Sequence, residues 1–144
     1  PKSSAAFRVL VVVDDDEPAA MLDLAAADID AVVRREATTQ GALRALAEFR
    51  ADVVVADLAI RDLATNLDFL ALLYALVYRP MPVGIAIGDG SAMLDGKRAL
   101  ESKYHAFLRK PLTTHGMRDA FRMASKIAMR RSHVRSKGKK TDDA

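Results

Sequence analysis

The sequence predicts an α/β fold in which a five-stranded parallel sheet carries helices on both faces. The first observation is that short continuous aliphatic runs recur along the 144 residues, and such runs are typical of strands buried on both faces. The second is that the segments between them show apolar residues at helical spacing. Five strand–helix units joined in this way form a parallel sheet with right-handed crossovers.

The aliphatic runs define the expected strands, at residues 9–13, 31–35, 52–57, 82–90 and 106–112. The segments between and after them define the expected helices, at residues 18–29, 40–49, 67–78, 91–104 and from 113 or 114 to about 129. The fourth strand enters a Gly-Asp-Gly turn. The fourth helix is the weakest because Gly96 lies in its middle, where glycine lowers helix propensity.

Residues with specific backbone preferences mark the helix ends. Pro18 suits a first helical turn, because its φ is fixed and its missing N–H would be unpaired there. Thr38 or Thr39 can cap the second helix, and Asn66 can cap the third. Pro80 disfavours helical geometry in the residue before it, so the third helix should end there. The chain shows no internal repeat, and we expect no second domain.

Charge is distributed unevenly along the chain. The net charge is +3, but residues 117–144 hold nine Lys or Arg and three Asp, a net +6, which leaves residues 1–116 at −3. Residues 130–144 are polar and low in apolar content. Such composition predicts a disordered basic tail or linker at 130–144, after a domain at residues 1–129.

Composition also restricts the class of protein. The chain contains no Cys, so disulfides and thiolate zinc sites are excluded, and a reducing cytoplasm is the expected location. No apolar stretch approaches the roughly 20 residues that a membrane span needs. The N-terminal residues contain no apolar signal-peptide core. We therefore expect a cytoplasmic protein without a membrane partner.

Polar residues stand at the carboxyl ends of three expected strands. They are Asp14, Asp15 and Asp16 after the first, Asp57 at the end of the third, and Lys110 followed by Pro111 in the fifth. The ends of parallel strands meet at one edge of a sheet, where ligands bind. Carboxylate oxygens suit Mg²⁺, and one carboxylate could act as a nucleophile toward a phosphoryl group. Lys110 would supply a compensating positive charge.

These features together resemble the receiver domains of two-component response regulators, the CheY-like superfamily. The resemblance covers about residues 8–129 and rests on three segments in order, "VLVVVDDDEP", "ALRALAEFRADVVVADL" and "FLRKPL". It implies a flavodoxin-like, doubly wound (βα)5 fold with strand order 2-1-3-4-5. It also implies a phosphoacceptor domain and not an enzyme, with at most self-catalysed phosphotransfer and autodephosphorylation.

The resemblance implies a role for each site residue. Asp57 would accept a phosphoryl group from a sensor histidine kinase or a phosphotransfer protein. Lys110 would contact the phosphoryl oxygens, aimed by a cis bond to Pro111. Mg²⁺ would be held by Asp57, by the backbone carbonyl of Ala59 and by two of the early aspartates. Phe107 falls at the aromatic switch position of the fifth strand, although an ordinary half-buried aromatic is the alternative interpretation.

The choice of the two early aspartates depends on the alignment. Counting back from the "EP" pair favours Asp15 and Asp16. Counting forward from the start of the first strand, or back from Asp57, favours Asp14 and Asp15. We expect Asp14 and Asp15 to be the metal ligands and keep Asp16 as the alternative.

Several positions depart from the receiver pattern. The fourth strand of a receiver ends in Thr or Ser, but the candidates here, Ile87 and Gly88, have no hydroxyl. A hydrogen bond to a charged group is worth about 1.5–3 kcal/mol, so its loss weakens the bias toward the active state. The usual receiver turn contains proline and glycine, but residues 61–66 contain neither. Residues 101–105 lack the pattern of small residues that precedes the fifth strand of a receiver. A degenerate pseudo-receiver that binds partners independently of phosphorylation is therefore the alternative.

Partners and competing chemistry complete the expectations. A receiver would switch a protein–protein surface formed by its last two helices and fifth strand, which is a possible homodimer interface. The basic segment could be a solvated helix end, a linker to an output domain or a nucleic-acid contact. We rank nucleic acid last because no aromatic residue follows Phe121. The spacing of Asp14 and Asp16 also occurs in haloacid dehalogenase-type phosphohydrolases, but the Thr expected after it is absent.

Overall fold

The computed structural model describes residues 7–60, 69–76, 78–89, 99 and 103–143, and of residues 132–143 the backbone alone. The strands are β1 (Arg8–Val12), β2 (Val32–Glu36), β3 (Val53–Asp57), β4 (Val83–Gly88) and β5 (Ala106–Arg109). The helices are α1 (Asp16–Ala27), α2 (Thr39–Ala45), α3 (Phe69–Ala75) and α5 (Thr114–Asp143). The expected cap Asn66 and most of the helix expected at 91–104 lie outside the described residues.

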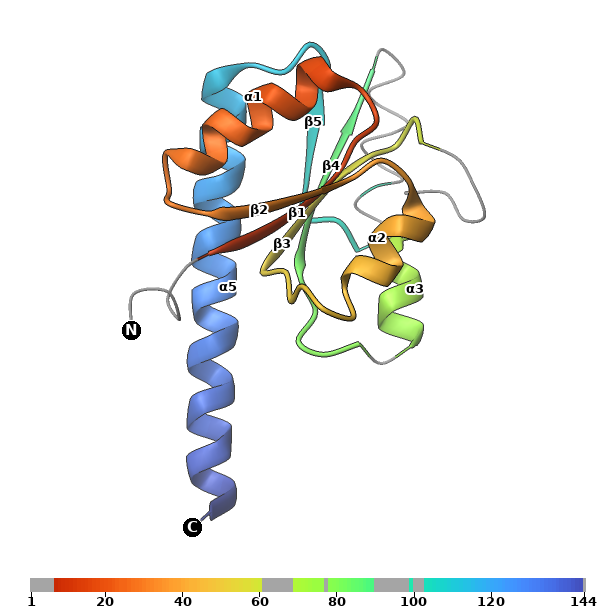
Figure 1. The fold of residues 1–144 in the computed structure, drawn as a ribbon. Helices are drawn as coiled ribbons and strands as arrows, with labels where there is room; N and C mark the ends of the chain where they lie inside the picture. Colours follow the sequence, from red (N-terminus) through yellow and green to blue (C-terminus); the bar gives the residue numbers. More distant parts are fainter. Residues whose placement is uncertain (1–6, 61–68, 77, 90–98, 100–102, 144) are drawn as a thin grey trace.

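The five strands form one parallel sheet in the order β2-β1-β3-β4-β5 (Figure 1). This order confirms the predicted doubly wound α/β fold. Helices α1 and α5 cover one face of the sheet, and α2 and α3 cover the other. The strand order reverses beside β1, which lies between β2 and β3, so the carboxyl ends of β1 and β3 are neighbours.

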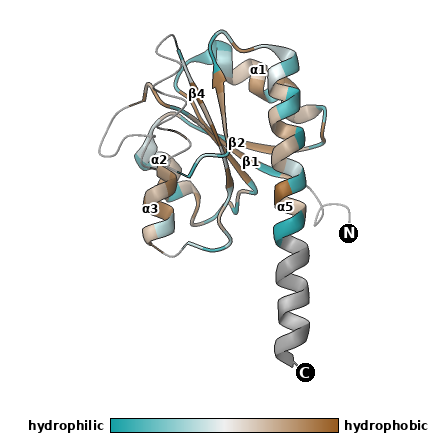
Figure 2. Cartoon of the chain, turned by 180° about the vertical axis from the view of Figure 1, so that it is seen from behind, coloured by the Kyte–Doolittle hydropathy of each residue, from teal (hydrophilic) through white to brown (hydrophobic). Residues whose placement is uncertain are grey.

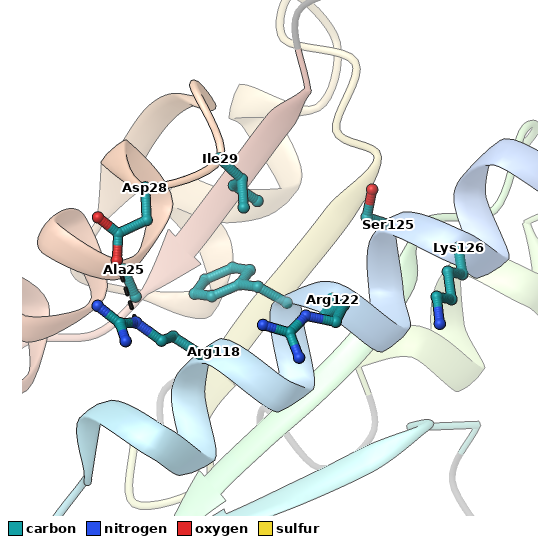
Figure 3. A pocket seen from close by; sticks show the side chains of 8 residues that line it. Ala25, Asp28, Ile29, Arg118, Arg122, Ser125 and Lys126 are labelled. Atoms are coloured by element: carbon teal, nitrogen blue, oxygen red, sulfur yellow. Dashed lines mark hydrogen bonds and ion pairs between the residues drawn. The ribbon is translucent and has the colours of Figure 1, made fainter.

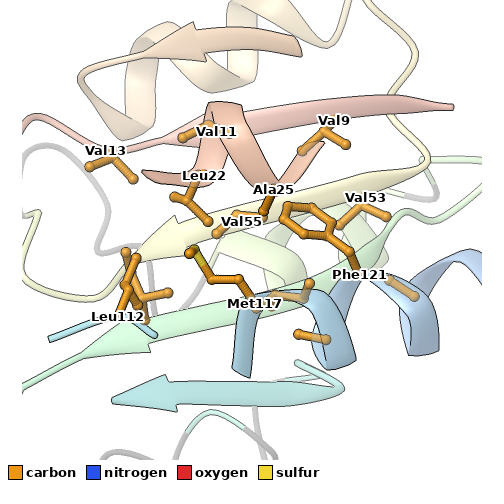
Figure 4. Close-up of a cluster of buried hydrophobic side chains, with 14 of the residues drawn as sticks. Val9, Val11, Val13, Leu22, Ala25, Val53, Val55, Leu112, Met117 and Phe121 are labelled. Atoms are coloured by element: carbon orange, nitrogen blue, oxygen red, sulfur yellow. The ribbon is translucent and has the colours of Figure 1, made fainter. Parts of the chain in front are cut away.

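Alternation along the strands divides the core between the two faces. Val9, Val11 and Val13 contribute to the cluster under α1 and α5, part of which is drawn in Figure 4. Leu10 and Val12 contribute to the cluster under α2 and α3. Successive strand residues point to opposite faces, so a continuous aliphatic run serves both layers. The hydrophobic colour along the strands in Figure 2 follows from this arrangement.

The helix starts follow local capping chemistry. Helix α1 begins two residues before Pro18, because Asp15 caps it and accepts a hydrogen bond from the N–H of Glu17 at 3.4 Å. Pro18 still lies in the first turn, where a missing N–H has no helical partner to lose. Of the two threonines, Thr38 caps α2, and its Oγ1 accepts from the N–H of Gly41 at 2.9 Å.

The last helix continues beyond the end that the sequence predicts. Residues 130–143 continue α5 as helix, and α5 extends past the sheet (Figure 1), while the division into a domain at residues 1–129 and a tail or linker at 130–144 stays a prediction. Low apolar content reports on packing, whereas helix propensity is a separate property. Arg and Lys favour helix, and no proline follows Pro111. Despite its 30 residues α5 is polar, and no helix among the described residues is long and apolar enough to cross a membrane.

Candidate functional site

The carboxylate of Asp57 and the ammonium of Lys110 meet at the carboxyl edge of the sheet. Asp57 is the last residue of β3 and is 1% exposed. Its Oδ2 lies 2.7 Å from Nζ of Lys110, and its Oδ1 accepts a hydrogen bond from the N–H of Ala59 at 2.9 Å. The structure thus joins two residues that are 53 positions apart in the sequence.

Strand register explains why these two side chains meet. Strands β3 and β5 both pair with β4, so they lie two strand spacings apart, roughly 9–10 Å. Asp57 lies opposite Ile87, and the N–H of Lys110 donates to the carbonyl of Gly88 at 2.6 Å, one residue beyond β5. The long side chain of Lys110 crosses the end of β4 to reach the carboxylate. The Lys110–Pro111 peptide bond is cis.

Because Asp57 is buried, its ion pair with Lys110 affects the stability of the fold as well as the orientation of the carboxylate. A carboxylate removed from water is tolerated only when donors replace its hydration, since an unpaired buried charge costs several kcal/mol. Asp57 has at least two donors, and no buried side-chain N or O atom among the described residues lacks a partner. The side chain of Lys110 is 26% exposed, so one end of the pair faces solvent.

The three early aspartates have different surroundings. Asp14 and Asp15 are exposed in the loop between β1 and α1, and Asp15 also caps α1. Asp15 and Lys110 line the same pocket, whose volume is about 370 Å³. Asp16 is the first residue of α1, and its Oδ1 lies 3.0 Å from Nη1 of Arg35 on β2. The structure therefore brings Asp15 close to the Lys110 side of the site and ties Asp16 to the neighbouring strand.

The oxygens at this edge fit magnesium by their chemistry, because carboxylates and backbone carbonyls are the hard ligands that this ion prefers. Among the described residues, no group of three or more His, Cys, Asp or Glu side chains is gathered as a metal-binding cluster. The ligand set expected from the sequence, Asp14, Asp15, Asp57 and the carbonyl of Ala59, stays a prediction.

Two of the expected switch positions, Ile87 and Phe107, lie on opposite faces of the sheet. Ile87 is fully buried in the cluster under α1 and α5. Gly88 ends β4 and pairs with Arg109. Phe107 is partly buried and packs against the cluster under α2 and α3. Residues 61–66, where the sequence departs from the receiver turn, lie outside the described residues.

Arg35 is a site residue that the sequence analysis missed. Its Nε donates to the carbonyl of Val13 at 3.0 Å while its Nη1 pairs with Asp16. Both contacts hold the loop that carries Asp14 and Asp15. The signal available in the sequence was the pair of arginines that follows Val32 and Val33 in this strand.

A second pocket, of about 480 Å³, lies between α1 and α5 away from the predicted site residues (Figure 3). Arg118, Arg122 and Lys126 extend from α5 along it. Arg118 Nε lies 3.3 Å from Oδ2 of Asp28 on the other wall. Arg122 Nη1 lies 4.0 Å from Oδ1 of Asp119, so two of the three cations already have an acidic partner in this chain.

Comparison with known proteins agrees with the fold. No protein-family model matches the sequence, and no curated protein matches it. Among solved structures, a signal receiver domain from Vibrio parahaemolyticus is similar with a TM-score of 0.80 and 17% identity, covering 90% of this chain and 97% of that chain. A CheY-like receiver domain from Methanospirillum hungatei has a TM-score of 0.75 and 16% identity, covering 88% and 98%.

A third similar structure is NtrX from Brucella abortus, with a TM-score of 0.80 and 17% identity. The match covers 91% of this chain but 29% of that longer chain. Identities this low establish the architecture alone. The fold is that of CheY-like receiver domains, as the resemblance of the sequence implied.

Proposed function

We propose that the chain is a two-component receiver that accepts a phosphoryl group on Asp57 from a sensor histidine kinase or a phosphotransfer protein. The observation that carries the proposal is the ion pair of Asp57 with Lys110 at the carboxyl edge of a receiver-type sheet. A carboxylate fixed there by a backbone N–H and an ammonium is held in one orientation, as a nucleophile needs.

The proposed step is a simple displacement at phosphorus. The phosphorus–nitrogen bond of a phosphohistidine breaks and its electron pair leaves on nitrogen, while a bond forms between phosphorus and a carboxylate oxygen of Asp57. Nζ of Lys110 lies 2.7 Å from Oδ2 of Asp57, so it is close enough to donate a hydrogen bond to the phosphoryl oxygens and stabilise their negative charge. Mg²⁺, when bound, would neutralise charge on the same oxygens.

Asp14 and Asp15 are the early aspartates that we assign to the metal. Asp16 is engaged by Arg35, whereas no described residue forms an ion pair with Asp14 or Asp15. Asp57 and the carbonyl of Ala59 would complete the protein ligands. This assignment corresponds to the alignment that makes Asp14 and Asp15 the metal ligands, and Asp16 is then the first residue of α1.

The proposed receiver would also interact with other proteins through a surface that changes on phosphorylation. Phosphorylation would switch the face formed by α5, β5 and the segment at 91–104, through which two copies could pair. The protein would act in the cytoplasm without catalysing turnover of external phosphoesters. We expect no hydrolysis of p-nitrophenyl phosphate.

A pseudo-receiver that binds partners without phosphorylation is the second candidate. Ile87 favours it, because the residue paired with Asp57 on β4 is apolar and fully buried and offers no hydroxyl to a phosphoryl group. In that case Asp57 and Lys110 would be a structural ion pair. Substitution at Asp57 would then leave partner binding unchanged.

Intact-mass spectrometry after incubation with acetyl phosphate and Mg²⁺ tests the proposal. The expected result is one added phosphoryl group, absent in Asp57→Asn and after chelation of the metal. Asp14→Asn should slow phosphorylation at least about tenfold, since a lost charge-assisted contact costs about 1.5–3 kcal/mol. Asp16→Asn is the matched control and should be phosphorylated at nearly the unsubstituted rate.

Two results would overturn the phosphoacceptor proposal. An adduct that persists in Asp57→Asn would move the acceptor to another residue. Failure to form any adduct, in a protein that is folded by circular dichroism, would favour the pseudo-receiver. If Asp16→Asn were impaired and Asp14→Asn were not, the metal ligands would be Asp15 and Asp16.

A further inference from the structure

A groove at the amino edge of the sheet, opposite the Asp57 site, has a composition that the receiver function does not use. It lies between the end of α3, the segment before β4 and the middle of α5, and its volume is about 530 Å³. Figures 1 and 2 show α3 and α5 on opposite sides of the sheet near this edge. Its lining residues are Tyr74, Arg79, Pro80, Met81, Ile127, Arg130 and Arg131.

The apolar part of the groove is accessible. Tyr74 is 53% exposed, and Met81 and Ile127 are only partly buried. Ile127 also packs against the core, which anchors the α5 wall of the groove. The volume falls in the range of about 300–1,000 Å³ that is typical of small-molecule sites. The groove therefore offers an aromatic ring and two aliphatic surfaces to an apolar body.

The charged part of the groove is formed by Arg79, Arg130 and Arg131. Arg131 donates from Nη1 to the carbonyl of Met81 at 2.7 Å, and Arg79 donates to the carbonyl of Tyr78 at 2.8 Å. The guanidinium of Arg79 lies 5.4 Å from the centroid of the Tyr74 ring. No carboxylate in the described part of the chain forms an ion pair with Arg79, Arg130 or Arg131.

The surroundings add further positive charge. Lys103 Nζ lies 4.8 Å from the Tyr74 ring centroid, on the rim of the groove. Burial lowers the pKa of Arg131, because desolvation disfavours its cationic form. An anion seated beside these side chains would offset both the repulsion between the cations and the energetic cost of removing the Arg131 guanidinium from water. The pocket in Figure 3 differs in this respect, because Asp28 already pairs with Arg118 there.

We propose that this groove binds a small organic anion, a molecule with an apolar body and one phosphate or carboxylate group. The anionic group would contact the guanidinium groups of Arg79 and Arg130, whose planar donors match either oxyanion in a bidentate fashion. The apolar body would pack on Tyr74, Met81 and Ile127. The site lies on the opposite sheet edge from Asp57 and does not depend on phosphorylation.

Titration of the full chain with 1-naphthyl phosphate, followed by amide chemical shifts, tests this inference. Saturable 1:1 binding is expected, with the largest shifts at Tyr78, Arg79 and Met81 and at residues 127–131. The same titration with 1-naphthoate distinguishes a carboxylate from a phosphate ligand. Uncharged 1-naphthalenemethanol should bind at least tenfold more weakly, and added salt should weaken binding of both anions.

The variant Arg79→Gln with Arg130→Gln removes two exposed cations and should weaken binding of the anions at least tenfold. The control, Arg122→Gln with Lys126→Gln, removes the same charge from α5 outside the groove and should change binding less than twofold. A third variant, Tyr74→Ala, should weaken the charged and uncharged probes alike. All five side chains are exposed, so folding should be retained.

Four outcomes would overturn the inference. Equal losses in the groove variant and the control would mean attraction to the basic helix in general. Largest shifts away from the groove would place the ligand elsewhere. Equal affinity for the uncharged probe would remove the role of the arginines. Failure of both naphthyl anions, with binding of an acidic peptide, would make the groove a protein-docking surface.

Discussion

The carboxylate of Asp57 is buried, where a charge without partners would destabilise the fold, so its neighbours must stabilise the ionised form. Lys110 and the N–H of Ala59 replace the water that burial removes. The pair is expected to stabilise the fold mainly by preventing an unpaired buried charge. Deleting one partner is therefore more harmful than deleting both.

We predict that Lys110→Ala lowers the free energy of unfolding by about 2–4 kcal/mol, because the carboxylate of Asp57 would remain buried without its cation. In an Asp57→Asn background the same substitution should cost at least about 1 kcal/mol less. Urea denaturation of the four proteins gives both values. Equal losses in the two backgrounds would mean that the ion pair does not contribute to stability.

His105 is a second residue whose charge state is set by its neighbours. Burial, and then the positive charge of Arg131, lower the pKa of His105 below its ordinary 6.5. The N–H of Gly84 lies 3.3 Å from its Nδ1, and Nη2 of Arg131 lies 3.2 Å from its Nε2. A neutral imidazole accepts at one nitrogen only, so just one of these two N–H groups can donate to it, and protonation would remove that acceptor as well.

We predict that stability falls as pH drops below about 6.5. The unfolded chain then binds a proton at His105 that the folded chain, with its lowered pKa, does not. The free energy of unfolding, measured in urea between pH 7.5 and 5.5, should decline less steeply in His105→Gln than in the unsubstituted chain. His115→Gln changes an exposed histidine and should keep the full decline. An unchanged decline in His105→Gln would exclude this residue.

At the scale of elements, α5 combines a packed half and a projecting half. Its described contacts with the body run from Met117 to Arg131, through core residues such as Phe121 and the hydrogen bond of Arg131 to Met81. The helix then continues to Asp143 beyond the sheet (Figure 1). The projecting half covers residues 132–143, and an isolated helix shorter than about 12–15 residues is marginal in water. The packed half is therefore expected to nucleate the projecting half.

We predict that a chain ending at Arg131 unfolds with a free energy within about 0.5 kcal/mol of the full chain, although its helical circular dichroism falls. A chain ending at Lys126 loses the packing of Ile127 and Ala128 and should be destabilised by at least about 2 kcal/mol. Similar destabilisation by both truncations would show that the projecting half contributes contacts of its own.

At the scale of the whole molecule, one sheet separates two apolar layers that share every central strand. Leu22 is buried in the layer under α1 and α5, and Leu70 is buried in the layer under α2 and α3. Because the strands contribute alternate residues to both layers, neither layer can be lost while the other keeps its register. Unfolding should therefore be one cooperative transition.

We predict that Leu22→Ala and Leu70→Ala each cost about 2–5 kcal/mol and that their effects add within about 0.5 kcal/mol. Tyrosine fluorescence and circular dichroism should report the same urea midpoint in each variant. The test is sharp for Leu22→Ala, because Tyr78 and Tyr104 lie in the other layer. A tyrosine transition unaffected by Leu22→Ala would mean that the layers unfold separately.

The sequence by itself determined which segments become strands, and where along the chain the site residues stand. Aliphatic runs at residues 9–13 and 53–56 report their burial on both faces directly. Strands that end in Asp57 and near Lys110 must deliver those residues to one edge, because all strands are parallel. These are local properties or consequences of topology, and both can be derived without coordinates.

Only the tertiary structure decided how far apart those residues lie and which neighbours neutralise them. The 2.7 Å contact of Lys110 with Asp57 depends on the register of β5 against β4, and the pairing of Asp16 with Arg35 depends on β2 lying beside β1. The arginine-lined groove likewise joins α3 to α5 across the sheet edge. Contacts between distant segments are set by packing, which periodicity and propensity do not encode.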